Sequence, residues 1–135
     1  MSKLENPKIN IKLKLAALWT SVMFCYIYGD YFELYAPSKV EDLINGVGML
    51  DTPMKLFAAS VMLAIPALMI SLSIFLKPGI SRWLNIIFGT FFTGIMLLIA
   101  VSSLTVWYTF YVFLALVESV LTALIVWHAW KWPRV

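Results

Sequence analysis

The stretch YVFLALVESVLTALIVW, from Tyr111 to Trp127, decides the fold class of this chain. Every residue in it except Glu118 is of a type that hydrocarbon tolerates. At 1.5 Å of rise per residue, this run and its flanks are long enough to cross a hydrocarbon layer of about 30 Å. The run also lacks the two-residue alternation of a barrel strand. We therefore predict a transmembrane helix over about 104–130, with a carboxylic acid near its middle.

The composition of the whole chain extends this prediction. Hydrophobic residues make up 62% of it and charged residues 13%, whereas a soluble domain has about half and a quarter. Three further apolar runs lie at about 15–35, 54–76 and 80–101. The sequence therefore predicts an all-α fold: a four-transmembrane-helix bundle that forms a single integral membrane domain over 1–135, with the lipid bilayer as its partner.

The distribution of charge predicts the orientation and excludes one class of partner. Eight basic residues would gather on one membrane face, and only Lys39 and Lys55 would lie on the other. The positive-inside rule makes the richer face cytoplasmic, so we expect both termini to be cytoplasmic. Because the basic residues flank apolar runs and form no patch with interleaved aromatics, we expect no nucleic-acid partner. The eight are Lys3, Lys8, Lys12, Lys14, Lys77, Arg82, Lys131 and Arg134.

The loop between the first two runs carries a helix signal of its own. Ser38 and Glu41 in SKVE have the spacing of a capping box. Val40, Leu43 and Ile44 follow as an apolar stripe, and Gly46 is suited to end the turn. We predict a short amphipathic helix in this first outer loop, serving either as a lid over the bundle or as an interfacial anchor.

Proline, glycine and helix-capping residues mark the other connections. Asp51 or Thr52 is suited to cap the second span, with Pro53 in its first turn. Pro66 is expected to kink that span. Ser81, after the turn signal Pro78-Gly79, is expected to cap the third span.

Glu118 should face the interior of the bundle, because an acid presented to lipid at the midplane costs about 2.5 kcal/mol or more. Helical spacing places it on a face that is small and polar, opposite a face that suits lipid. No lysine or arginine lies at its depth, so we expect it to be largely protonated and to donate a hydrogen bond. The small face comprises Tyr111, Ala115, Glu118, Thr122 and Ala129, and the lipid face Phe113, Leu116, Val120 and Leu124. The candidate acceptors are Tyr111, Thr122, Thr90, Thr93, Ser21 and Tyr28.

Two interpretations of Glu118 remain open at this point. It is either a neutral residue that fixes helix register, or a site for a proton, a cation or a polar ligand group. Asp30 and Glu33 share a face at the outer end of the first span, where they are either plain water-facing acids or an acidic vestibule. No third oxygen ligand accompanies them, so no metal site is predicted. His128 is either an interfacial residue or a relay, and a lone histidine excludes bis-histidine haem ligation within one chain; we expect no cofactor.

The stretches ENPKINIKLKLAALWTSVMFCYIYGDYFELY and WHAWKWP resemble a family of small four-span bacterial membrane proteins of unknown function. This resemblance implies a bacterial inner-membrane protein and supplies no activity or site residues. More loosely, the chain is similar to DoxX-like membrane proteins and to small multidrug-resistance exporters. Those exporters carry their membrane glutamate in the first span, whereas Glu118 lies in the fourth.

Three functions are consistent with these features. The leading hypothesis is a small membrane transporter or ligand-binding membrane protein that takes a small cationic or amphipathic ligand, as a homodimer or higher homo-oligomer. One alternative is a membrane enzyme acting on a lipid-soluble substrate, which is less favoured because no nucleophile–base pair can be identified. The other is a structural or accessory subunit that docks through Ala115, Ser119 and Ala123. The candidate ligand- or proton-binding residues are Glu118, Asp30, Glu33, Tyr111, Thr122 and Tyr28.

Overall fold

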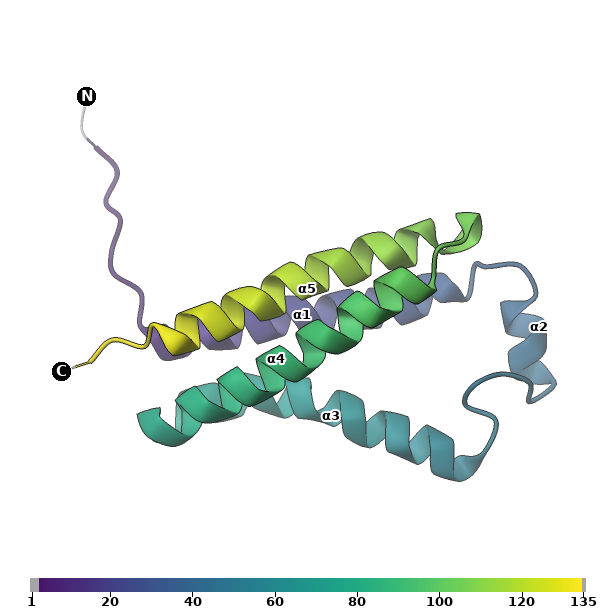
Figure 1. Cartoon of the computed structure of the whole chain (residues 1–135), viewed down its shortest axis with the longest axis horizontal. Helices are drawn as coiled ribbons and strands as arrows, with labels where there is room; N and C mark the ends of the chain where they lie inside the picture. Colours follow the sequence, from purple (N-terminus) through teal and green to yellow (C-terminus); the bar gives the residue numbers. More distant parts are fainter. Residues whose placement is uncertain (1–2, 135) are drawn as a thin grey trace.

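The computed structural model describes residues 3–134, and these residues form helices and connecting turns without any strand. Four of the helices are long and apolar enough to cross a membrane, so the predicted all-α fold with four helices able to span a membrane is confirmed. In Figure 1 the second of these long helices along the chain diverges from the others. The elements are α1 (Ile11–Glu33), α2 (Lys39–Ile44), α3 (Pro53–Phe75), α4 (Pro78–Ser102), η1 (Val106–Tyr108) and α5 (Thr109–Trp130).

The first long helix starts earlier than hydropathy predicts. α1 begins at Ile11, where the side-chain oxygen of Asn10 accepts a hydrogen bond of 2.8 Å from the backbone N–H of Lys12. Lysine is a good helix former, so the basic leader continues the helix that an apolar window would start at residue 15. The same helix ends at Glu33, two residues before the predicted boundary.

The predicted capping role of Ser81 is wrong. α4 begins at Pro78, whose fixed φ suits the first helical position, and Lys77 is the residue before it. Ser81 is therefore already one turn inside the helix. It is fully buried there and its hydroxyl donates a hydrogen bond of 3.3 Å to the backbone carbonyl of Ser73 on α3.

The predicted helix in the outer loop is present as α2, and Gly46 ends it with a φ of 68°. The predicted capping box is wrong, because Ser38 has a φ of 66° and its side chain makes no capping hydrogen bond. In the left-handed region the hydroxyl does not reach the first N–H groups of the helix. No residue of α2 is buried, and Figure 1 shows α2 at the margin of the bundle, between the ends of α1 and α3.

The tightest packing joins α4 to α5. Gly89 on α4 is buried against α5, and a Cβ added to it would lie 2.7 Å from Cγ2 of Val126. The absence of a side chain at this position lets the two backbones approach closely, as small residues do in membrane helix pairs. α1 packs against α5 and α3, and its buried face runs from Leu15 through Trp19 and Val22 to Tyr26.

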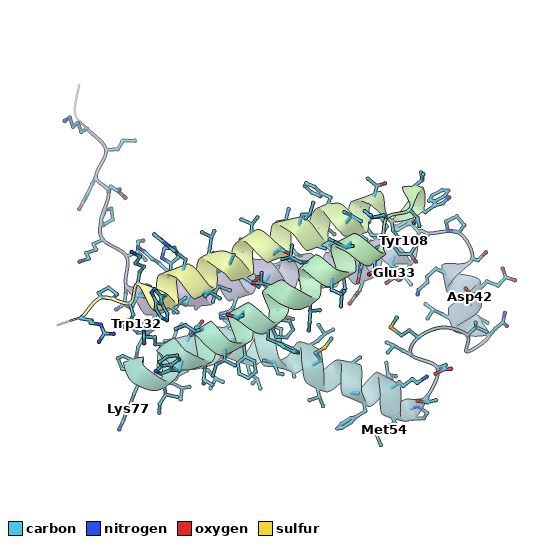
Figure 2. The ribbon with its side chains drawn as sticks, viewed as in Figure 1. Glu33, Asp42, Met54, Lys77, Tyr108 and Trp132 are labelled. Carbon is cyan, nitrogen blue, oxygen red and sulfur yellow. The ribbon has the colours of Figure 1, made fainter. Side chains whose placement is uncertain are left out.

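α3 joins the bundle along only one half. Its buried residues, Pro66, Met69 and Ser73, all lie in the second half of the helix. Thr52 caps its first turn by accepting a hydrogen bond of 3.2 Å from the backbone N–H of Lys55, as predicted. The first turns of the helix stand apart from α1, α4 and α5 in Figures 1 and 2, where Met54 marks the free end, and Leu63 and Ile65 already pack against the core.

Charge is segregated between the two ends of the bundle. Figure 2 shows Lys77 and Trp132 at one end, and Glu33, Asp42 and Tyr108 at the other. At the first of these, which we call the basic end, Lys12 donates hydrogen bonds of 2.9 Å and 3.3 Å to the carbonyls of Leu76 and Ile74. Lysine near a helix C-terminus satisfies carbonyls that have no partner within the helix, so this contact stabilises the end of α3.

Candidate functional site

Glu118 lies inside the bundle, as the sequence predicts. It is twelve residues from each end of the membrane-spanning segment Val106–Trp130, and only 4% of its surface is exposed. The predicted division of α5 into two faces is also present. Ala115, Glu118, Thr122 and Ala129 are buried and Tyr111 is half-buried, whereas Phe113, Leu116, Val120 and Leu124 are exposed on the opposite side.

The hydrogen bond that we expected from the Glu118 carboxyl is not formed. Within residues 3–134, no side chain is hydrogen-bonded to the carboxyl. The Thr122 hydroxyl instead donates a hydrogen bond of 3.0 Å to the backbone carbonyl of Glu118. The same hydroxyl lies 2.6 Å from that of Thr93, which joins α5 to α4. Threonine in a helix commonly bonds the carbonyl one turn earlier, and here that preference turns Thr122 away from the carboxyl.

Tyr26 is a buried tyrosine of α1 that was not among the predicted site residues. The side chain is 7% exposed, and its hydroxyl is buried without a hydrogen-bond partner among the described residues. Glu118 and Tyr26 are buried and Tyr111 is half-buried on the inner faces of α5 and α1. We call these three side chains the interior polar group. Helical spacing from Trp19 and Val22 would have placed Tyr26 on this face.

The outer mouth of the bundle differs from the pair of free acids expected there. Asp30 is exposed, but Glu33 is half-buried and forms an ion pair with Lys39 at 3.1 Å. Glu33 also accepts a hydrogen bond of 3.4 Å from the hydroxyl of Tyr108. The carboxylate of Glu33, hydrogen-bonded to the Lys39 ammonium, raises the pKa of Lys39. One of the two vestibule acids is therefore already neutralised by a cation from α2.

Tyr28 and Tyr111 have different environments. Tyr111 faces α1, where a Cβ added to Gly29 would lie 3.7 Å from its ring. Tyr28 is 53% exposed and lies among aromatic rings, with centroids 6.5 Å from Phe24 and 6.2 Å from Phe32. The structure therefore packs Tyr111 against α1 and leaves Tyr28 on the outer surface of α1.

The remaining candidate partners of Glu118 are dispersed. Ser21 and Thr90 are exposed, and the hydroxyl of Thr93 is hydrogen-bonded to that of Thr122. His128 is half-buried, and its ring packs edge-on against Trp127 at 4.9 Å between centroids. Among the described residues, no group of three or more histidine, cysteine, aspartate or glutamate side chains is arranged to hold a metal ion.

A second buried polar cluster lies toward the basic end and was not predicted. Asn85 on α4 accepts hydrogen bonds of 2.7 Å from the Trp19 indole and 3.3 Å from the Ser73 hydroxyl. Its amide nitrogen donates a bond of 2.7 Å to the carbonyl of Ser81. These side chains are fully buried and mutually bonded across α1, α3 and α4, so the cluster orients the helices. An amide inside an apolar run was the signal that would have predicted it.

Comparison with known proteins places the chain in a family. A family model described as "Family of unknown function (DUF6326)" matches residues 3–134. The chain belongs to the DUF6326 family. Neither a curated protein nor a solved structure matches it. The resemblance to a family of unknown function is thus confirmed, whereas the looser likeness to DoxX-like proteins is not. The DUF6326 description assigns no activity, so any function is argued from the geometry of the site.

Proposed function

We propose that this protein is a small ligand-binding or transporting membrane protein in which Glu118 binds a proton, a cation or a polar group of a ligand. The ligand class is a small cationic or amphipathic molecule. The observation that carries the proposal is a pair of interior polar side chains: Glu118 is 4% exposed and its carboxyl forms no hydrogen bond with a described residue, and the Tyr26 hydroxyl is buried without a hydrogen-bond partner among them. Intramembrane acids are costly, and they usually mark a binding site or a transport path.

The cost of leaving such groups unpaired argues against a purely structural role. A buried polar group without a partner costs about 1–3 kcal/mol, and more when it is charged. Asn85 shows that this chain satisfies a buried polar side chain fully where the role is to orient helices. A ligand that carries both a positive charge and a hydrogen-bond acceptor would satisfy Glu118 and Tyr26 together.

The outer mouth supports a route for a cation. Asp30 is exposed at the outer end of α1. Glu33 is held by Lys39, so a cation would have to displace the lysine in order to use that carboxylate. An exposed acid near the entrance raises the local concentration of cations, and a buried acid below it binds them more strongly.

We further propose a bacterial inner-membrane location with both termini cytoplasmic, because eight of the ten basic residues lie at the basic end. A homodimer or higher homo-oligomer fits the small number of helices and the exposed first turns of α3, residues 53–58. Labelling of single cysteines placed at positions 8 and 45, in a Cys25→Ala background, tests the orientation. Labelling of the two sites from the same side of sealed vesicles would contradict it.

The proposal is tested by the pH dependence of ligand binding. Binding of a lipophilic cation such as tetraphenylphosphonium to purified protein should weaken as the pH is lowered, because protonation removes the charge of Glu118. Glu118→Gln should abolish this dependence. Glu33→Gln makes the same chemical change at the outer mouth and serves as the control, since it should leave most of the dependence in place. Unchanged pH-dependent binding in Glu118→Gln would contradict the proposal.

Native mass spectra of protein extracted in a mild detergent give an independent measurement. A small molecule that the wild type retains and Glu118→Gln loses would support the site, and its mass would begin to identify the ligand. Tyr26→Phe, which removes only the unpartnered hydroxyl, should weaken retention without unfolding the bundle. Identical bare oligomers in all three spectra would instead favour a register-setting role for Glu118.

A further inference from the structure

The basic end of the bundle contains a small cavity of a different character from the interior polar group. Its volume is about 190 Å³. It opens where the first turn of α4 meets the segment after α5. Such a volume is below the roughly 300–1,000 Å³ of a drug-sized ligand pocket, but it exceeds the ~30 Å³ that one water occupies. The lining residues are Pro78, Gly79, Arg82, Trp83, Trp132 and Arg134.

Arg82 is held rigidly at this cavity. Its Nε donates a hydrogen bond of 3.1 Å to the carbonyl of Ala129, and Nη2 donates one of 3.4 Å to that of Trp130. The guanidinium also lies 5.1 Å from the ring centroid of Trp83 and 5.4 Å from that of Trp130. Two of its five N–H donors are used in these hydrogen bonds, so three remain for a ligand. A guanidinium fixed in this way is ready to bind an anion at little entropic cost.

Among residues 3–134, no acidic side chain forms an ion pair at the basic end, where the leader contributes Glu5. The sequence has no aspartate or glutamate from residue 54 to residue 117, and none after Glu118. The two ion pairs of the described residues, Lys39–Glu33 and Lys55–Asp51, both lie at the opposite end. Arg134 adds a second guanidinium to the cavity wall, and the uncapped first turn of α4 adds the positive end of its helix dipole. The cavity is therefore suited to a compact anion.

We propose that this cavity binds the phosphate headgroup of an anionic phospholipid. Arginine pairs well with phosphate through parallel N–H donors, and tryptophans mark the depth of the lipid headgroups. Ile80 and Trp83 beside the cavity are each 53% exposed, and they provide an apolar surface for the acyl chains. Basic pockets between membrane helices bind anionic headgroups by this combination of charge and apolar contact. The proposal does not depend on the function of Glu118.

The test is native mass spectrometry of the purified protein titrated with phosphatidylglycerol, with phosphatidylcholine as the zwitterionic reference. Arg134→Gln should weaken binding of the first phosphatidylglycerol by about tenfold, because a charge-assisted hydrogen bond to phosphate is lost. Lys131→Gln is the matched control. It removes the same charge at the same end of the chain, but Lys131 does not line the cavity, so binding should weaken by less than about threefold.

Arg134 is exposed, so Arg134→Gln should fold normally, and a circular dichroism melt of each variant checks this. Arg82→Lys keeps the charge but loses the fork of donors, and it should also weaken the first lipid. Equal losses in Arg134→Gln and Lys131→Gln would overturn the proposal in favour of a diffuse positive surface. A lack of preference for phosphatidylglycerol over phosphatidylcholine would also overturn it. Displacement of the lipid by millimolar inorganic phosphate would assign the cavity to a free phosphate compound instead.

Discussion

The indole Nε1 of Trp19 donates a hydrogen bond of 2.7 Å to Oδ1 of Asn85, and both side chains are fully buried. This bond joins α1 to α4, and Ser73 extends the connection to α3 at 3.3 Å. In hydrocarbon a buried amide without partners is unfavourable, so the bundle forms with these helices in the one register that satisfies all the groups. Asn85 thus orients three of the four spanning helices.

Replacing Asn85 should destabilise the bundle. Asn85→Leu leaves the Trp19 indole and the Ser73 hydroxyl without their acceptor, and we expect a loss of about 1–2 kcal/mol in the free energy of unfolding. Unfolding in mixed detergent micelles measures this. Thr90→Val, at an exposed position of the same helix, should change the free energy by less than about 0.5 kcal/mol. Equal stabilities of the two variants would show that the cluster does not orient the helices.

Two glycines of α4 should respond oppositely to alanine. In Gly89→Ala the new Cβ would lie 2.7 Å from Val126 and 3.3 Å from both Ile125 and the carbonyl of Thr122. The contact with backbone cannot relax easily, so α4 and α5 must separate, at a cost of about 1–3 kcal/mol. A Cβ at Gly94 meets nothing within 4 Å, so Gly94→Ala should be neutral or stabilising. Thermal unfolding of the two variants is the measurement, and a stable Gly89→Ala protein would disprove the close approach.

The hydroxyl oxygens of Thr93 and Thr122 lie 2.6 Å apart, and the hydrogen bond between them should couple α4 to α5. In a double-mutant cycle of Thr93→Val and Thr122→Val, we expect a coupling energy of about 0.5–1.5 kcal/mol, the range measured for hydrogen bonds between membrane helices. Valine is nearly isosteric with threonine, so the cycle reports the bond rather than a cavity. A coupling energy near zero would mean that each hydroxyl relies on its own helix carbonyl, which both can reach.

The ion pair of Lys39 with Glu33 should hold α2 to the outer end of α1 over the physiological pH range. Glu33 raises the pKa of Lys39 above its ordinary 10.5. A group whose pKa is raised in the folded state contributes stability below its unfolded pKa. That contribution is lost only as the pH rises through the higher folded value, so the pair should persist at and above neutrality. With both side chains about one-quarter exposed, we expect the pair to contribute about 0.5 kcal/mol.

Lys39→Gln should therefore increase amide hydrogen exchange in residues 37–45. Lys55→Gln breaks the other ion pair, Lys55–Asp51, whose atoms lie 2.9 Å apart on the far side of the loop. That control should leave exchange in residues 37–45 unchanged. If Lys39→Gln leaves it unchanged as well, α2 is held by its apolar residues and not by the ion pair.

Much of the architecture could be predicted from the sequence because it depends on local properties. Hydrophobic run length determines which segments are long enough to span, and Glu118 has to face inward because lipid solvates an acid poorly. Gly46 ends α2 because a turn with positive φ favours glycine. Boundaries were less predictable. Asn10 starts α1 within the basic leader, and Pro78 starts α4 before Ser81, since capping and proline geometry outweigh hydropathy at helix ends.

The interior partners were decided by the tertiary structure alone. Periodicity places Tyr26 and Asn85 on inward faces, but only the packing of α1, α3 and α4 determines that Asn85 is fully bonded and that the Tyr26 hydroxyl is not. The sequence likewise puts Asp30 and Glu33 on one helix face, yet the fold brings Lys39 to Glu33 alone. These outcomes depend on how rigid helices approach one another, because the distances between side chains on different helices are set by packing rather than by sequence spacing.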